Sequence, residues 1–251
     1  MTQYHIGLSE EHGAKYAIIP GDPGRVPKIA AFLDDAKQVG YNREYNSYLG
    51  YLDGEKVLVT STGIGGPSCA ICVEELAKIG VDTFIRVGTC GGMQPEVAPG
   101  DVVIATGAIR MDGTSREYMP IEFPAVADFH VTSALYEAAN KLGYDNHIGV
   151  VQAKDSFYGQ HAPESMPVSS ELLAKWDAWK KGGCLASEME GATLFIVSAA
   201  RKLRSGAVFH CVWNQEVAKS GMPKERTEDT SAAIKTAIEA LRILIKKDKK
   251  D

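Results

Sequence analysis

The 251-residue sequence has no long hydrophobic run and no excess of positive charge. A span of about 18 apolar residues is needed to cross a bilayer, and none occurs, so we expect no membrane partner. The net charge is −5 with both signs interspersed, which argues against nucleic acid as a partner. The first residues lack the basic region and the apolar core of a secretory signal. The expected location is therefore cytoplasmic.

Cysteine is scarce, with five residues in the whole chain. Cys69 and Cys72 have CxxC spacing, but they fall inside an expected helix. No second pair follows them at the spacing of a zinc site. We therefore expect reduced, mostly buried thiols, without a disulfide framework or a structural metal.

Several nucleotide and hydrolase motifs are also absent. The chain has no GxxxxGK[ST], which argues against a nucleoside triphosphatase, and no GxSxG of the α/β-hydrolases. The segment Gly63-Ile64-Gly65-Gly66 resembles a dinucleotide fingerprint. However, Ser68 stands where the third glycine belongs, so a dinucleotide enzyme is disfavoured.

Residues 57–92 carry the clearest pattern in the chain. The apolar runs Val57–Ser61 and Thr83–Val87 are typical of buried strands, and between them a helix is expected to begin at Pro67. This arrangement predicts a βαβ unit in a parallel sheet. Glycine turns are expected directly after both strands, at 62–66 and 88–92, where open α/β sheets bind ligands.

Arg86 lies two residues before the second expected turn. A strand buried on both faces leaves little room for a guanidinium. Arg86 is therefore either half of a buried ion pair or a clamp for an anion. Arg25, after the turn Pro20-Gly21-Asp22-Pro23-Gly24, is a second candidate anion site, or else an exposed arginine beside a well-formed turn.

Strands and helices alternate along the rest of the chain, without a linker or a repeat. We expect one domain over residues 1–251, an α/β fold with a mixed central sheet flanked by helices. Asp53-Gly54 is the expected turn of an antiparallel hairpin. Residues 154–169 show no periodicity and are expected to be a loop. Residues 246–251 form a charged tail that should be disordered.

Two further groups of residues could bind a nucleoside. Phe157, Tyr158, Gln160 and His161 could stack on and hydrogen-bond a planar ring, or else belong to a plain surface loop. Glu188 and Glu190 precede a strongly apolar helix, where a carboxylate could accept the hydroxyls of a sugar diol. Together with an anion site, these groups suit the phosphorolysis of a nucleoside. A non-catalytic binder of small molecules is the alternative, although it gives no reason for the arginines at glycine turns.

Six motifs in order carry a resemblance to a known family. They are PGDPGR (20–25), STGIGGPS (61–68), FIRVGTCGG (84–92), EFPAVADF (122–129), DSFYGQ (155–160) and SEMEGAT (187–193). The sequence resembles the uridine phosphorylase branch of the nucleoside phosphorylase family over nearly its full length. The resemblance implies a nucleoside phosphorylase-like fold. It also implies conversion of uridine and phosphate into uracil and ribose 1-phosphate, with phosphate as co-substrate and no cofactor.

The resemblance also implies roles for individual residues. Arg86 and Glu190 would be the catalytic pair. The positions that match phosphate ligands are Gly21, Arg25, Arg43, Arg86 and Thr89. Those that match ribose contacts are His5, Glu188, Met189 and Glu190, with Glu190 on the 2′ and 3′ hydroxyls. Phe157 and Gln160 match the positions that stack on and read uracil.

An assembly is implied as well, a hexamer built from three dimers that each share two sites. Arg43 and His5 would then reach into the site of the partner subunit. Glu44, Ile64 and Ser68 match positions that hold a monovalent cation such as K⁺ between subunits in some members.

Two departures from the family pattern concern the base. Bacterial members have an arginine two residues after the reading glutamine and another after the last strand, where this sequence has Ala162 and Gln215. Lys154, His161 or Lys219 could supply the missing charge. Purine-specific relatives carry an aspartate where Asn214 stands. A pyrimidine nucleoside is therefore the preferred substrate, and phosphorolysis of purine nucleosides on the same scaffold is the alternative.

Overall fold

The computed structural model describes residues 1–221 and 225–250. Over this range the chain forms one mixed sheet with helices on both faces, which confirms the predicted fold class. Ten strands are present in the described part: β1 Tyr16–Pro20, β2 Asp34–Asn42, β3 Tyr45–Leu52, β4 Glu55–Thr60, β5 Thr83–Gly92, β6 Val102–Met111, β7 Ala125–Val126, β8 Asn146–Lys154, β9 Ala186–Glu188 and β10 Arg204–Asn214.

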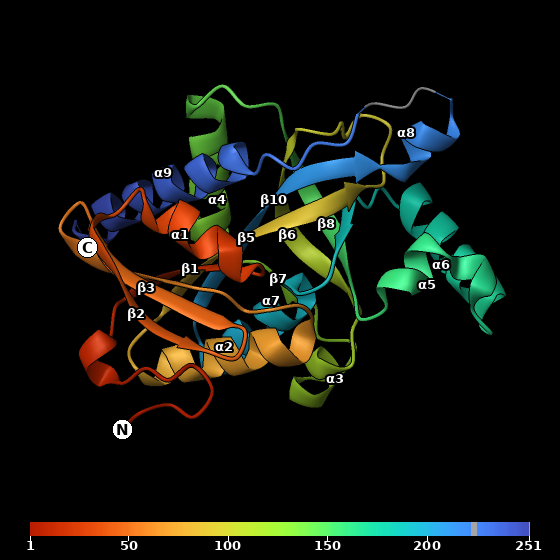
Figure 1. Cartoon of the computed structure of the whole chain (residues 1–251). Helices are drawn as coiled ribbons and strands as arrows, with labels where there is room; N and C mark the ends of the chain where they lie inside the picture. The colour runs from red at the N-terminus through yellow and green to blue at the C-terminus, as the bar shows by residue number, and fades with distance from the viewer. Residues whose placement is uncertain (222–224, 251) are drawn as a thin grey trace.

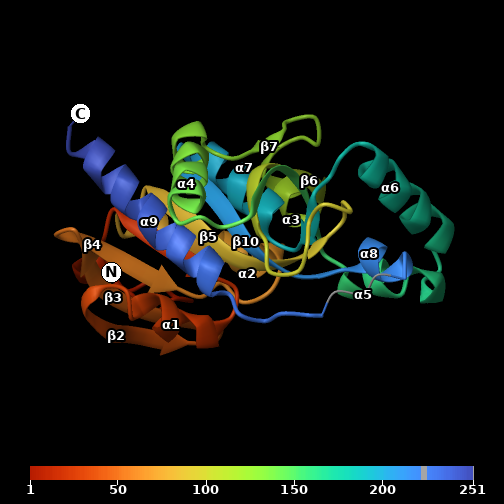
Figure 2. The ribbon, with the colours of Figure 1, turned by 90° about the horizontal axis from the view of Figure 1, so that it is seen from above.

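The helices lie in two layers and one lateral group (Figure 1). One layer comprises α1 (Val26–Ala30), α4 (Phe129–Lys141) and α9 (Ser231–Asp248), and the opposite layer comprises α2 (Gly66–Lys78), α3 (Thr114–Tyr118) and α7 (Gly191–Arg201). The lateral group comprises α5 (Phe157–His161), α6 (Ser169–Lys181) and α8 (Gln215–Lys219). Three short 3₁₀ helices are η1 (Glu10–His12), η2 (Pro23–Arg25) and η3 (Pro163–Ser165). Figure 2 shows both chain ends far from the lateral group.

The order of the strands explains how the sheet creates a site. β5 pairs with β1, β9 and β10, while β10 also pairs with β6, so strands β5, β9, β8, β6 and β10 close into a ring. The predicted crossover through α2 is present, but β1 lies between its two parallel strands, β4 and β5. The hairpin turn is also confirmed, with Asp53 and Gly54 both at positive φ between β3 and β4.

The expected glycine turn at residues 88–92 is wrong, because β5 continues as a strand to Gly92. The glycines allow close packing there instead of a turn. A Cβ on Gly88 would lie 2.6 Å from Phe209 Cδ1, and one on Gly92 would lie 2.6 Å from Asn214 Nδ2, both on the neighbouring strand β10. Only a residue without a side chain lets β5 and β10 run together over this length.

Two other expectations also need correction. Residues 154–169 are not a loop throughout, because Ser156 Oγ accepts a hydrogen bond from Gly159 N at 3.0 Å and caps the short helix α5. The tail is not disordered from residue 246, because α9 extends through Asp248, whose carboxylate accepts hydrogen bonds from Arg204 and Tyr16. The last residue of the expected tail, Asp251, lies outside the described residues.

No helix in residues 1–221 and 225–250 combines the length and the apolar character needed to span a bilayer.

Candidate active site

The carboxyl ends of the parallel strands β1 and β4 open into a central cavity of about 980 Å³. Segments from across the sequence line it: the turn after β1, the turn after β4, the second half of β5, helix α5 and the residues between β9 and α7. Of the residues to which the resemblance assigns a role, ten line this cavity: Gly21, Arg25, Glu44, Ile64, Arg86, Thr89, Phe157, Glu188, Met189 and Glu190. This is the edge where an open α/β sheet binds ligands.

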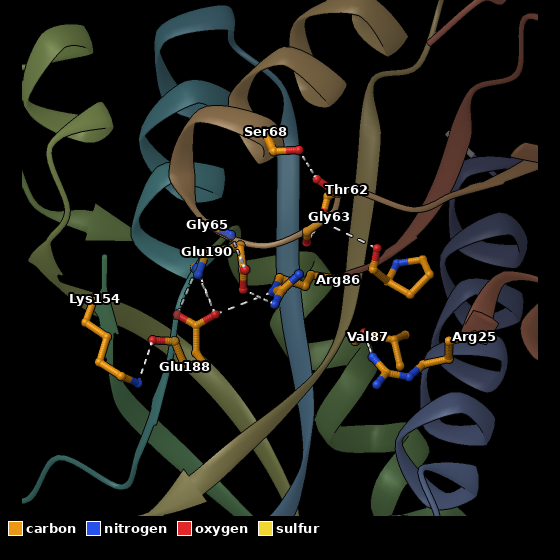
Figure 3. A network of polar contacts seen from close by, with 12 residues as sticks. Arg25, Thr62, Gly63, Gly65, Ser68, Arg86, Val87, Lys154, Glu188 and Glu190 are labelled. Atoms are coloured by element: carbon orange, nitrogen blue, oxygen red, sulfur yellow. Dashed lines mark hydrogen bonds and ion pairs between the residues drawn. The ribbon is translucent and has the colours of Figure 1, made fainter. Parts of the chain in front are cut away.

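Arg86 lies at the centre of the cavity wall and is only 3% exposed (Figure 3). Its Nη2 forms an ion pair with Glu190, and its Nε lies 3.4 Å from Glu188 Oε2. Burial lowers the pKa of Arg86, but the attraction of the two carboxylates outweighs burial and raises the pKa overall. Its Nη1 has no hydrogen-bond acceptor among the described residues. The guanidinium is therefore charged and retains an unused donor.

Arg25 brings a second guanidinium to the same side of the cavity. Arg25 Nη1 donates to the carbonyl of Val87 at 3.2 Å (Figure 3). Burial lowers the pKa of Arg25, Asp22 opposes this effect, and Arg86 adds to it. Gly21 keeps this place uncrowded, because a Cβ there would lie 3.1 Å from the carbonyl oxygen of Gly63 and would also contact Arg86 Nη1 at 3.9 Å. Two guanidiniums beside open space are suited to a multiply charged anion such as phosphate.

The two glutamates have different hydrogen-bond partners. Glu188 accepts hydrogen bonds from the backbone N–H groups of Glu190 at 2.9 Å and Gly191 at 2.8 Å, so it fixes the start of α7. Burial raises the pKa of Glu188, although Arg86 and these N–H groups oppose the effect. Glu190 Oε1 accepts from Gly65 N at 2.6 Å. Glu190 thus connects the glycine turn after β4 to Arg86, at a position where its carboxylate can accept hydroxyl groups.

A side cavity of about 500 Å³ adjoins the central cavity and shares Lys154, His161 and Trp213 with it. Gln160 lines this side cavity. Phe157 lines the central cavity, where its ring packs against that of His161 with a centroid distance of 4.2 Å. The two residues that match base-binding positions therefore line adjoining cavities.

The sequence reasoning missed Ser187 and Gln152. Ser187 Oγ accepts a hydrogen bond from Lys154 Nζ at 2.7 Å and lies within hydrogen-bond distance of the Oε1 atoms of Gln152 and Gln160. Ser187 on β9 pairs with Gln152 on β8, and residues that alternate along β8 place Lys154 beside it. Buried polar residues at alternating positions in an apolar strand were the available signal.

His5 and Arg43 do not line either cavity. They belong to a separate group near the amino terminus, where Arg43 lies over the ring of Tyr4 at 5.9 Å and His5 Nδ1 lies 2.7 Å from Glu75 Oε1. Glu75 also accepts the backbone N–H groups of His5 and Ile6. Tyr4 is 75% exposed, so this group presents an aromatic and two basic side chains toward the surface.

Ser68 completes the predicted cation set, although it does not line the cavity. Its Oγ donates to Glu44 Oε1 at 2.7 Å, and this hydrogen bond lowers the pKa of Glu44. Ile64, on the same glycine turn, is 78% exposed. In residues 1–221 and 225–250, no cluster of three or more His, Cys, Asp or Glu side chains has the arrangement of a metal site.

Asn214 is fully occupied by structural hydrogen bonds. Its Nδ2 donates to the carbonyls of Gln94 at 2.7 Å and Val97 at 2.8 Å. Its Oδ1 accepts from the backbone N–H groups of Glu216 and Val217 and so caps α8. The amide therefore connects the segment after β5 to the start of α8, and it has none of the acidity that would let it protonate a base.

Comparison with known proteins is consistent with this geometry. A family model described as the phosphorylase superfamily matches residues 15–247. A uridine phosphorylase of Treponema pallidum is 53% identical over 98% of this chain and 95% of its own. A uridine phosphorylase of Escherichia coli is 41% identical over 96% and 98%. A guanosine phosphorylase of Halorubrum lacusprofundi is 39% identical over 96% and 99%.

Proposed function

The chain belongs to the phosphorylase superfamily, and from this premise we propose that it catalyses the phosphorolysis of uridine to uracil and ribose 1-phosphate. The observation that carries the proposal is Arg86, a buried cation paired with Glu190 whose Nη1 has no acceptor among the described residues. An anion clamp directly beside a carboxylate provides adjacent places for phosphate and for a sugar diol.

Phosphate would bind on the Arg25 side of Arg86, with Gly21 leaving it room and Thr89 lining the wall. Glu190 would accept the 2′ and 3′ hydroxyls of ribose, beside Met189. A phosphate oxygen then forms a bond to C1′ while the C1′–N1 bond breaks, and the electron pair leaves with uracil. The sugar gains positive charge in the transition state, and the adjacent phosphate stabilises it electrostatically.

A pyrimidine base fits this site better than a purine. Protonation of a departing purine requires an acidic side chain near its imidazole ring, and Asn214 stands where purine-specific relatives carry an aspartate. Because Asn214 is bound to four backbone groups, it cannot take that role. Phe157 and Gln160 would stack on and read uracil at the junction of the two cavities.

We further propose that the protein works as dimers assembled into a hexamer, with Arg43 and His5 contributed to the partner's site. Both residues lie outside the cavities of their own chain and near its surface, which supports this arrangement. The group of Glu44, Ser68 and the backbone carbonyl of Ile64 supplies only oxygen ligands, which fits a monovalent cation such as K⁺ at the same interface.

An assay of uridine against inosine, each with and without phosphate, tests the activity. We expect phosphate-dependent release of uracil that exceeds the release of hypoxanthine. Equal or greater turnover of inosine would transfer the assignment to purine nucleosides, whereas no phosphate-dependent turnover of either substrate would remove the proposed activity altogether.

A further inference from the structure

Lys154 is a buried cation that the roles assigned so far do not use. It lies at the end of β8, is only 5% exposed and lines both the central and the side cavity. Its Nζ donates to Ser187 Oγ at 2.7 Å. A longer contact, to the carbonyl of Glu188 at 3.4 Å, is shown in Figure 3. Among the described residues no carboxylate lies within ion-pair distance of it, and its third N–H has no acceptor.

An unpaired buried ammonium is costly to maintain, so structural benefit alone gives little reason for it. The other two candidates for the missing charge are placed differently. Lys219 is exposed and lies 3.5 Å from Glu216 on its own helix. His161 is exposed and packs on Phe157. All three line the side cavity, but Lys154 alone of them is buried, and it donates to Ser187, which in turn contacts Gln160.

We propose that Lys154 is a catalytic residue that donates a hydrogen bond to a carbonyl oxygen of the departing uracil and so replaces the arginines missing at Ala162 and Gln215. This inference rests on the proposed function. As the C1′–N1 bond breaks, its electron pair passes to N1 and is delocalised onto the carbonyl oxygens of the ring. The ammonium stabilises that negative charge, and the uracil anion takes its proton from water after it leaves.

Ser187 orients the side chain of Lys154 through a hydrogen bond. Because Ser187 Oγ receives one N–H of Lys154 and lies against Gln160 Oε1, it fixes both side chains together. The amide nitrogen of Gln160 and the third N–H of Lys154 then remain for the base. Two donors at the junction of the cavities suit a ring with two carbonyl groups.

The test compares two leaving groups in two variants. Lys154→Gln keeps length and polarity but loses the charge, and Lys154→Arg keeps the charge. We expect kcat/KM for uridine to fall roughly 100-fold in Lys154→Gln, as for loss of a pre-organised donor. It should fall less than about tenfold in Lys154→Arg. With 5-fluorouridine, whose base leaves more readily, the loss in Lys154→Gln should be clearly smaller. The control is Lys181→Gln, which removes an exposed ammonium paired with Asp177 on α6 and lining neither cavity, and which should match the wild type. Lys219→Gln tests the competing candidate and should lose much less activity than Lys154→Gln.

The pH dependence of activity in the wild type and in Lys154→Arg supplies a second test, which does not use the uncharged variant Lys154→Gln. Burial lowers the pKa of Lys154 to about 8, while Glu188, Glu190 and the Cys90 thiol, which face it from β9, the start of α7 and β5, oppose this shift. His161 also faces it from α5. The ammonium form exists below its pKa, so activity on uridine should fall as the pH rises through about 8. The ratio of Lys154→Arg to wild-type activity should then rise, and this ratio cancels the titration of uridine itself.

Equal losses on uridine and 5-fluorouridine in Lys154→Gln, or an activity ratio that stays flat between pH 7 and 9.5, would overturn the role of Lys154 while leaving the proposed activity intact. A loss in Lys219→Gln equal to that in Lys154→Gln would also overturn it. Failure of the wild-type protein to cleave uridine in the presence of phosphate would instead remove the proposed function and this inference with it.

Discussion

Arg86 on β5 and Glu190 at the start of α7 are 104 positions apart in the chain, yet their side chains form an ion pair that is almost completely buried. Both residues line the central cavity, where we propose that phosphate and ribose bind next to each other. A buried ion pair costs desolvation energy and is weak evidence for stability. Its position in the cavity wall supports the proposal that Arg86 and Glu190 bind the substrates in addition to pairing with each other.

The first prediction concerns the anion side of this pair. Arg86→Ala should lower kcat/KM for uridine at least ~100-fold, about 2.7 kcal/mol, because it removes a pre-organised charge beside the reacting phosphate. Arg86→Lys should recover part of the loss. Steady-state kinetics with varied phosphate measure the effect. Arg201→Ala, which removes an exposed guanidinium paired with Glu74, is the matched control and should be unchanged. Wild-type phosphate dependence in Arg86→Ala would exclude the clamp.

The second prediction concerns the carboxylate. Glu190→Gln should reduce kcat/KM more for uridine than for 2′-deoxyuridine, because an ionised carboxylate accepts two hydroxyls and a neutral amide offers a single acceptor. The ratio of the two losses is the measurement. If both substrates lose activity equally, Glu190 does not bind the 2′-hydroxyl, and its main role is to pair with Arg86.

Whether the sequence alone predicts a feature of this site depends on how far apart in the chain the interacting residues are. Arg86 could be recognised as either an ion pair or an anion clamp, but the choice needed a partner 104 positions away, and the structure provides both the pair and an unused donor. The glycines at 88–92 resembled a turn because local sequence shows conformational freedom. It does not show that Phe209 and Asn214 press against them from β10.

The fold could be predicted more completely from the sequence, because its helices and strands follow the local periodicity of apolar residues. The helix after the glycine turn begins at Gly66, one residue before the expected Pro67, and the hairpin turn is where Asp53-Gly54 places it. What periodicity could not give is the insertion of β1 between β4 and β5, since pairing between distant strands is set by tertiary packing. The same limit hid the Lys154–Ser187 contact, which requires β8 and β9 to be adjacent.

A third prediction tests the end of α9. Asp248 accepts hydrogen bonds from Arg204 Nη1 at 3.0 Å and from Tyr16 Oη at 2.9 Å, and Lys15 Nζ lies 3.1 Å away. Asp248→Asn should therefore lower stability at pH 7 by about 2 kcal/mol. For a chain of this size that corresponds to roughly 4–8 °C in Tm. Asp177→Asn, which breaks an exposed pair within α6, is the control and should leave Tm unchanged.

The pKa of Asp248 determines how its contribution to stability should change with pH. The hydrogen bond from Arg204 is the main cause that holds the pKa of Asp248 well below its usual range. A depressed carboxyl pKa stabilises the folded state at pH values above the unfolded pKa, and this contribution is lost as the pH falls through the folded pKa. The Tm difference between wild type and Asp248→Asn should have its largest value at pH 7 and become smaller below about pH 4. A difference that stays constant down to pH 3 would contradict the assigned cause.

The last prediction tests whether sites are shared between subunits. Arg43 lies at positive φ between β2 and β3 and lines neither cavity of its own chain, so the described residues of one subunit do not place it beside the proposed phosphate site. In a two-fold dimer, a residue that enters the partner's site does so reciprocally. Arg43→Ala and Arg86→Ala should each be nearly inactive alone. Refolded together, they should form mixed dimers in which one site holds both arginines and the other holds neither.

With random pairing, about half of the dimers are mixed, so roughly a quarter of all sites should regain activity. Native mass spectrometry establishes that mixed species are present, and refolding each variant with itself is the control. Suppose mixed oligomers form but show no more activity than the two parents. Arg43 then lies outside the neighbouring site, and the equivalent role of His5 falls with it, because both belong to the same surface group around Tyr4.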